Sequence, residues 1–297
     1  MSIIEKAISK LEKNVSIKVE KISQRAEQKA NVESIPVLAR VKDDLRDSTA
    51  HLVDSHVQEI AKTNFINIDL DRLRRLGIVT PDQGKTQIAE QFRIIKRPLL
   101  TKAFAKKNNN LIMISSAFAG EGKSFCAVNL AMSVASEMDH RVLLVDADVA
   151  RPSLPNLLGF KNEKGLMDLL LGGPDNVADV MIKTNVEKLS FIAAGKSHSH
   201  ATELLASQTM VMLLEELAQR YNDRIVIFDA PPILLTSEAR VLAERMGQIV
   251  LVVEAERTTQ QALSHVLNQF NTKSNISLIY NKVRTFSASE YYGHYYA

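Results

Sequence analysis

The chain has 297 residues, of which 45% are hydrophobic and 24% are charged, and its formal net charge is +3. This composition is typical of a globular protein, and the small net charge gives no reason to expect a nucleic-acid partner. A single cysteine, Cys126, excludes an intrachain disulfide and is expected in the core, and no apolar run approaches the roughly 20 residues of a membrane-spanning helix. We expect a cytoplasmic protein that meets a membrane through a partner or a surface helix.

Residues 1–80 differ from the rest of the chain. They are highly charged and lack the short β-branched runs that follow. Apolar residues recur at helical spacing between Ile3 and Val15, which predicts an N-terminal extension used for docking or oligomerisation. A basic helix resting on a membrane is the alternative, although three glutamates in the first 20 residues dilute its charge.

From residue 86 onward, predicted helices and strands alternate. The first helix covers residues 86–97, and Pro98 is expected to end it. Six short apolar runs are predicted strands: 111–115, 142–146, 189–193, 225–229, 249–253 and 277–281. The main helices between them are expected at 123–138, 210–221, 237–246 and 259–270. Buried strands separated by helices predict an α/β fold, a doubly wound and mostly parallel sheet with helices on both faces.

The first predicted strand leads into Ala117-Phe118-Ala119-Gly120-Glu121-Gly122-Lys123-Ser124, at the place of a P-loop between a strand and a helix. Its glycines would let backbone amides approach phosphate oxygens, and the following helix directs its positive end at them. We expect Lys123 to neutralise the phosphates of ATP and Ser124 to ligate Mg²⁺. The strict pattern has glycine in place of Ala117, so this loop is deviant. The predicted nucleotide-binding residues are Ala119, Gly120, Glu121, Gly122, Lys123, Ser124 and Phe125.

Carboxylates follow two of the predicted strands. Asp146 and Asp148 come at the end of one, and Asp229 ends another. Ligands bind at the carboxyl ends of strands in such sheets, and Mg²⁺ prefers carboxylates, waters and substrate oxygens. We therefore expect Asp229 and Asp146 at the metal. The alternative is that these residues cap turns, but three aspartates behind one P-loop are hard to explain in that way. Asn281, at the end of the last strand, is a candidate contact for adenine or an ordinary turn residue.

Four of the six tyrosines lie in the last seven residues, at Tyr291, Tyr292, Tyr295 and Tyr296. Chain termini bury little, so bulky aromatics are seldom placed there. A nucleotide site together with a cluster of hydroxyl acceptors predicts an enzyme that phosphorylates its own tail. Asp148 would then accept the tyrosine proton. An aromatic tail that packs on a neighbouring subunit is the alternative.

Together these motifs resemble those of the bacterial tyrosine kinases (BY-kinases) of polysaccharide synthesis. The family joins a deviant Walker A loop to a second aspartate motif, here Val145-Asp146-Ala147-Asp148, and to a Walker B motif, here Phe228-Asp229-Ala230-Pro231-Pro232. The resemblance covers roughly residues 85–297. It implies tail autophosphorylation with ATP and Mg²⁺ between subunits of a transient homo-oligomeric ring. Its implied partners are an activating membrane co-polymerase and a cognate tyrosine phosphatase, which would place the kinase at the inner membrane through a partner.

The resemblance also implies a ring contact. The family's Glu-x-x-Arg-x-x-Arg helix is matched by Glu90 and Arg93, whereas Lys96 replaces the second arginine. Ala150 likewise stands where many relatives have arginine, with Arg151 beside it. The expected domains are an extension (1–80), a kinase domain (81–286) and a tyrosine-rich tail (287–297).

The alternative function is a non-kinase P-loop ATPase that acts as an assembly or positioning switch. Partitioning and cell-division-site ATPases of this kind carry a signature lysine where this chain has Phe118.

Overall fold

A computed structural model describes residues 64–284, apart from 83, 85, 162–163, 175, 221–223 and 271–274. The predicted N-terminal helix and the tail tyrosines lie outside the described residues. One compact unit begins at Thr63, earlier than the boundary expected at residue 80. The reason is that Leu73 and Ile78 are fully buried in its core, so this segment belongs to the folded unit.

The described residues form an eight-stranded sheet in the order β1-β4-β5-β3-β6-β2-β7-β8. Its strands are β1 (Phe65–Ile66), β2 (Leu111–Ser116), β3 (Arg141–Asp146), β4 (Ile182–Thr184), β5 (Leu189–Ile192), β6 (Arg224–Asp229), β7 (Gln248–Glu254) and β8 (Ile276–Asn281). Neighbouring strands are parallel except for the antiparallel pair β4 and β5. The predicted α/β fold is confirmed, and its six strands lie where they were expected. The short strands β1 and β4 were not predicted.

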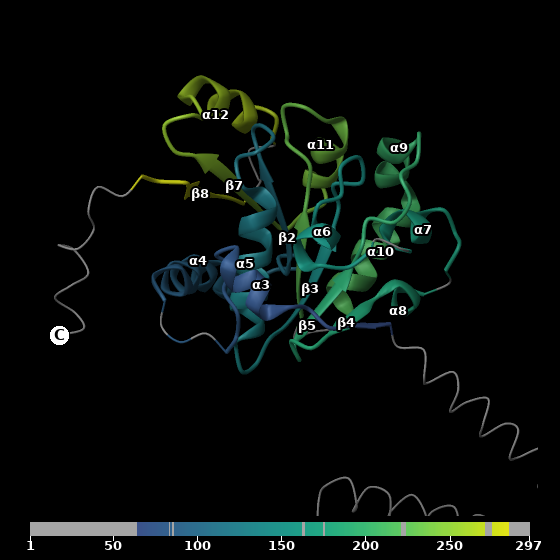
Figure 1. Ribbon diagram of the computed structural model, residues 1–297. Coiled ribbons are helices and arrows are strands. Elements are labelled where there is room, and N and C mark those ends of the chain that lie inside the picture. The colour runs from purple at the N-terminus through teal and green to yellow at the C-terminus, as the bar shows by residue number, and fades with distance from the viewer. Residues whose placement is uncertain are drawn as a thin grey trace, which may run out of the picture. The chain divides into compact units, whose positions relative to one another are not determined.

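Helices cover both faces of this sheet (Figure 1). One face is packed by α3 (Leu70–Arg75), α4 (Gln87–Ala103), α5 (Lys123–Ala135) and α6 (Leu154–Leu158). The other is packed by α7 (Leu166–Leu170), α8 (Val177–Val180), α9 (Ala201–Ala206), α10 (Gln208–Gln219), α11 (Ser237–Ala243) and α12 (Gln260–Leu267). No helix in the described part of the chain is long and apolar enough to cross a membrane.

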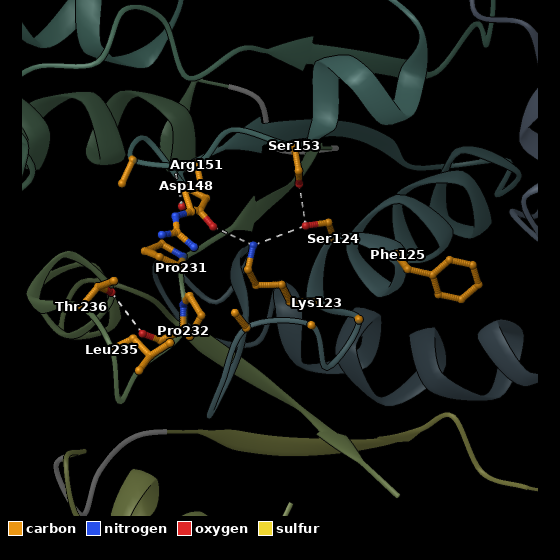
Figure 2. Close-up of a pocket in the computed structure, with 14 residues that line it drawn as sticks. Lys123, Ser124, Phe125, Asp148, Arg151, Ser153, Pro231, Pro232, Leu235 and Thr236 are labelled. Carbon is orange, nitrogen blue, oxygen red and sulfur yellow. Dashed lines mark hydrogen bonds and ion pairs between the residues drawn. The ribbon is translucent and has the colours of Figure 1, made fainter. Parts of the chain in front are cut away.

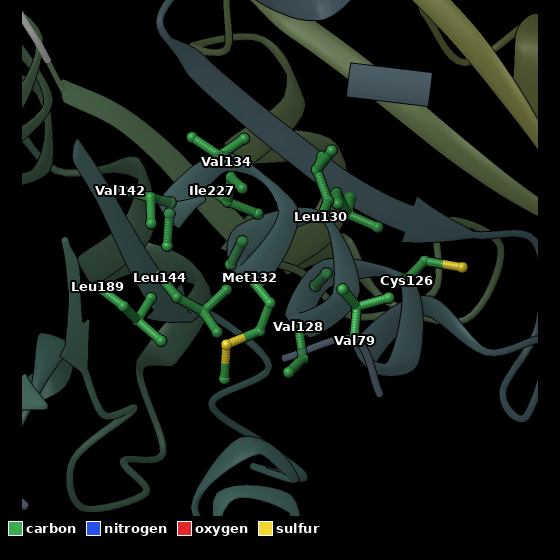
Figure 3. Close-up of a cluster of buried hydrophobic side chains, with 14 of the residues drawn as sticks. Val79, Cys126, Val128, Leu130, Met132, Val134, Val142, Leu144, Leu189 and Ile227 are labelled. Atoms are coloured by element: carbon green, nitrogen blue, oxygen red, sulfur yellow. The ribbon is translucent and has the colours of Figure 1, made fainter. Parts of the chain in front are cut away.

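Successive side chains of the central strands point to opposite faces of the sheet, which divides the core into two clusters. On β2, Ile112 and Ile114 pack on one face, whereas Leu111 and Met113 pack on the other. Figure 3 shows part of the first cluster, in which side chains of α5 pack on one face of the sheet against Val142 and Leu144 of β3. Cys126 lies in this cluster with 1% of its surface exposed, and burial raises the pKa of its thiol to about 12. Its predicted place in the core is confirmed.

The expected end of the first long helix at Pro98 was wrong. Helix α4 continues through Pro98 to Ala103. Pro98 cannot donate to the carbonyl group of Ile94, but both residues are exposed, so water can satisfy that carbonyl. Beyond the proline, Leu99 and Ala103 are buried, and their packing favours continuation of the helix.

The strand order brings the predicted site residues to one edge of the sheet. β3 and β6 are neighbours, and Asp146 pairs in register with Asp229. β2 lies on the other side of β6, and the P-loop follows directly from β2. The ends of these three central strands therefore place two carboxyl groups beneath one phosphate-binding loop.

Candidate active site

The P-loop backbone requires its two glycines. Gly120 and Gly122 have φ angles of 87° and 99°, in the left-handed region that other residues seldom adopt. A Cβ atom on Gly122 would also lie 2.1 Å from the side-chain nitrogen of Asn281. The loop then enters α5 at Lys123, so the helix N-terminus faces the space above the strand ends.

Lys123 is held between two carboxyl groups. Its Nζ lies 2.8 Å from Oδ2 of Asp148 and 3.8 Å from Oδ1 of Asp229. Figure 2 shows Lys123 directed toward Asp148, with Ser124 on its other side. Burial by itself would lower the pKa of Lys123, but the carboxylates of Asp229 and Asp148 outweigh it, so this pKa is raised. The lysine is therefore a fixed positive charge in this site.

Asp229 is a fully buried carboxyl group without a hydrogen-bond partner among the described residues. Burial raises its pKa to about 6, against the opposing effect of Lys123. Buried polar atoms in proteins are nearly always hydrogen-bonded, so two oxygens without a hydrogen bond, one of them 3.8 Å from the Lys123 ammonium, indicate a place for a bound cation or its waters. The chemistry of this group fits Mg²⁺.

Asp146 lies next to Asp229 and has two local hydrogen bonds. Its oxygens accept from the backbone N–H groups of Asp148 at 3.3 Å and Leu154 at 3.2 Å. Burial and the neighbouring Asp229 raise the pKa of Asp146 to about 8. Asp148 in turn accepts from the N–H of Arg151 at 3.2 Å. These aspartates do cap turns, as the alternative interpretation held, and they also face the lysine.

Ser124 has a partner that sequence reasoning missed. The hydroxyl group of Ser153 donates to the Ser124 hydroxyl at 2.9 Å, as Figure 2 shows. Ser153 precedes α6 and is brought to the P-loop by the turn that Asp146 and Asp148 organise. It orients the hydroxyl group that is the candidate ligand for Mg²⁺.

A cavity of about 490 Å³ opens above these groups. The P-loop supplies one wall through Ala119, Gly120, Gly122, Lys123, Ser124 and Phe125. The opposite wall consists of Asp148, Ala150, Arg151, Ser153, Pro231, Pro232, Leu235 and Thr236. Arg151 thus lines the cavity beside Ala150. The cavity lies where the loop amides and Lys123 can contact a phosphate chain.

Two expected nucleotide-binding residues are placed differently. Glu121 is 2% exposed, and its carboxylate accepts from the N–H of Phe118 at 2.8 Å and also contacts the hydroxyl group of Thr258. Its side chain therefore braces the loop. The Nδ2 atom of Asn281 donates to the carbonyl oxygen of Glu121 at 2.9 Å and does not line the cavity. Neither side chain faces the described cavity, although the backbone of residue 121 remains part of the loop.

The three predicted ring-contact residues do not share one exposed surface, because Glu90 and Arg93 are partly exposed and Lys96 is buried. Glu90 and Arg93 form an ion pair of 2.7 Å on the exposed side of α4. Lys96 is 5% exposed, donates to the carbonyl oxygen of Ser133 at 2.7 Å and lies 2.5 Å from a carboxylate oxygen of Glu137. The expectation that Lys96 contacts another subunit is not supported, because its ammonium group is used to join α4 to the end of α5.

A glycine-rich loop between a strand and a helix, a lysine among carboxylates and a doubly wound sheet together define a nucleotide-binding protein of the P-loop class. Residues 109–281 match the AAA domain family (AAA_31). The tyrosine-protein kinase YwqD of Bacillus subtilis is 30% identical over 225 residues, which are 75% of this chain and 92% of that protein. The chain belongs to the bacterial tyrosine kinases.

Solved structures agree with this assignment. The chimeric protein CapA2B2 superposes with a TM-score of 0.62 at 25% identity, over 75% of this chain and 94% of that one. The kinase domain of the Escherichia coli tyrosine kinase ETK superposes with a TM-score of 0.56 at 25% identity, over 73% of this chain and 96% of that one.

Other relatives are much longer than the matched region. The tyrosine-protein kinase ptk of Acinetobacter johnsonii is 33% identical over 205 residues, which are 69% of this chain and 27% of that protein. The chain spans about a quarter of the length of the first curated relatives it matches, from 22% to 27%.

Proposed function

We propose that the protein is an ATP-dependent tyrosine kinase that phosphorylates Tyr291, Tyr292, Tyr295 and Tyr296 at its own C-terminus. The observation that carries the proposal is the position of Lys123, 2.8 Å from Asp148 and 3.8 Å from Asp229 at the floor of a cavity beside the P-loop. Such a lysine supplies the charge that a phosphate chain needs, and the carboxylates beside it supply metal ligation and proton acceptance.

Ser124, Asp229 and Asp146 would hold Mg²⁺, and the ion would supply positive charge to the phosphates of ATP. Lys123 turns from its carboxylate partners to the phosphate oxygens when the nucleotide binds. Gly120 and Gly122 allow the loop amides to approach the same phosphates.

Transfer then requires a proton acceptor. The tyrosine oxygen attacks the γ-phosphorus, the bond from that phosphorus to the β,γ-bridging oxygen breaks, and ADP leaves. A tyrosine hydroxyl group with a pKa near 10 keeps its proton at neutral pH, so a base must take it. Asp148 would take this role, and its 2.8 Å contact with Lys123, which would move to the phosphates, supports the proposal.

The acceptor tail comes from another subunit of a homo-oligomeric ring. The span from Asn281 to Tyr291 can extend to roughly 33–36 Å, which is long enough for a neighbouring site. A membrane co-polymerase activates the kinase and holds it at the inner membrane, a cognate phosphatase reverses the modification, and the cycle regulates polysaccharide polymerisation or export. The family membership of the chain supports this setting.

The test is direct. The purified 297-residue chain is incubated with ATP and Mg²⁺, with and without the cytoplasmic part of the candidate activator, and phosphotyrosine is mapped by mass spectrometry. We expect phosphate within residues 291–296. A protein that binds and hydrolyses ATP but leaves these tyrosines unmodified with the activator present would instead be the assembly switch described as the alternative.

A further inference from the structure

The end of β8 is attached to the P-loop by two successive side chains. The Nδ2 atom of Asn281 donates to the carbonyl oxygen of Glu121 at 2.9 Å. The Nζ atom of Lys282 donates to the carbonyl oxygen of Gly120 at 2.7 Å. Two neighbouring carbonyl groups of the loop are thus held by two neighbouring residues that lie 160 and 162 positions further along the chain.

These bonds fix the direction in which the loop amides point. In a trans peptide unit the C=O and N–H groups point in opposite directions, and the described residues contain no cis peptide. The carbonyl group of Gly120 shares its peptide unit with the N–H of Glu121, and the carbonyl group of Glu121 shares its unit with the N–H of Gly122. Because the carbonyl groups are held on the β8 side, both N–H groups are turned away from it. A carbonyl that accepts a hydrogen bond also makes the N–H of its unit a stronger donor.

The attachment is itself supported. Lys282 has a φ angle of 56°, which is uncommon for a residue other than glycine and marks a position where surrounding contacts hold the backbone. Its Nζ lies 3.2 Å from a carboxylate oxygen of Glu254, whose side chain is 13% exposed. The backbone N–H of Glu254 donates to the hydroxyl group of Thr258, which contacts Glu121. The ends of β7 and β8 therefore hold the loop from one side as a connected group.

We propose that Asn281 and Lys282 are positioning residues for the nucleotide phosphates, acting through the Gly120–Glu121 and Glu121–Gly122 peptide units. The inference rests on the nucleotide site proposed above and adds a role for the end of β8. It replaces the adenine contact expected of Asn281, because the side-chain nitrogen is already bonded to the loop. The effect of losing either residue should fall on nucleotide affinity, since no substrate tyrosine is involved.

The experiment measures binding of Mg²⁺–ADP to the full chain by isothermal titration calorimetry. Asn281→Asp keeps the shape of the side chain but replaces the donor by a carboxylate that repels the Glu121 carbonyl oxygen. Lys282→Met keeps the length and removes the ammonium group. We expect each variant to bind Mg²⁺–ADP roughly tenfold more weakly, the loss expected for one charged or well-aligned hydrogen bond. Arg284→Met is the matched control, because it removes a charge from the same segment without a contact to the P-loop.

Two further variants separate positioning from stability. Lys282→Gly removes the ammonium group and relaxes the backbone at the positive φ angle, so the nucleotide-free protein should melt at about the temperature of the wild type while affinity falls as in Lys282→Met. Lys282→Arg retains a donor and should recover most of the affinity. With ATP as substrate, the KM of the Lys282→Gly variant should rise while kcat changes little.

Unchanged Mg²⁺–ADP affinity in both Asn281→Asp and Lys282→Met, or an equal loss in Arg284→Met, overturns the inference. A wild type that binds Mg²⁺–ADP but forms no phosphotyrosine would remove the kinase proposal and leave this inference intact. A wild type that binds no nucleotide would remove both.

Discussion

The ammonium group of Lys123 lies 2.8 Å from the carboxylate of Asp148, and both side chains are almost completely buried, at 12% and 7% exposure. Asp229 lies 3.8 Å from the same ammonium group, Asp146 is its neighbour across the strand pair, and both have raised pKa values. One cation cannot balance three adjacent carboxylates, so the nucleotide-free site retains a proton at neutral pH. The site is therefore arranged to exchange protons for a metal ion.

Binding of Mg²⁺–ADP should release protons. The pKa values of Asp229 and Asp146 are about 6 and about 8, and a metal ion requires the ionised forms. Affinity should therefore rise between pH 6 and pH 8, by up to about tenfold per pH unit where one proton is released. Calorimetry at pH 7 in two buffers of different ionisation enthalpy gives the proton count, and Asp146→Asn should reduce it. Identical binding enthalpies in the two buffers would contradict the prediction.

Asp229→Asn should stabilise the nucleotide-free protein at high pH. The folded-state pKa of Asp229, about 6, lies above its unfolded value near 3.8, so its ionisation removes stability as the pH rises from about 4 through 6. The variant lacks this loss and should gain about 3 kcal/mol in free energy of unfolding at pH 8, with a smaller gain at pH 5. Urea denaturation at the two pH values measures this difference. Asp139→Asn, a substitution at an exposed position, is the matched control.

Lys123→Met should abolish phosphorylation and leave the fold intact. The variant loses the charge that faces the phosphates, and removal of one such preorganised group typically lowers a rate by about 10²–10³-fold. Phosphotyrosine formation measures the effect, and circular dichroism measures the fold. Lys183→Met, at an exposed position of β4, should phosphorylate as the wild type does. Activity in the Lys123 variant close to that of the control would mean that the phosphate site lies elsewhere.

Substitutions of Lys96 and Arg93 should affect different properties, the first the stability of the fold and the second the assembly of subunits. Lys96 is buried and joins α4 to the backbone of Ser133, so Lys96→Met should lower the free energy of unfolding by about 1–2 kcal/mol without changing the oligomeric mass. Arg93 is half exposed. If α4 forms the ring contact, Arg93→Ala should lower the oligomeric mass and leave the free energy of unfolding unchanged. Urea denaturation and light scattering distinguish the two. A Lys96 variant of normal stability that no longer assembles would restore its place in the interface.

The sequence predicted those parts of the fold that depend on local patterns. Runs such as the one at β6 are buried along their whole length, which makes them apolar and easy to recognise. The P-loop and Asp229 were predictable because glycine conformation and strand-end position have regular physical causes. The end of α4 was not predictable, because the packing of Leu99 and Ala103 keeps the chain helical beyond Pro98.

Contacts between distant segments could not be predicted in this way. Lys282 donates to a carbonyl group 162 residues away. Ser153 follows β3 and Ser124 follows β2, and the two residues meet only because both strands pair with β6. Their residue types carry no local sign of such partners. The burial of Lys96 is of the same kind, because a lysine at a helical position is ordinarily expected at the surface.

Transfer of phosphate to the tail of another subunit is tested most directly by mixing two defective chains. One carries Lys123→Met and keeps its tail, and the other has an intact site but lacks residues 287–297. Both are incubated with ATP, Mg²⁺ and the activator, and tail phosphotyrosine is measured by mass spectrometry, with each chain alone as control. We predict phosphotyrosine on the tail of the Lys123→Met chain only in the mixture. No phosphate in the mixture, under conditions in which the wild type modifies its own tail, would contradict transfer between subunits.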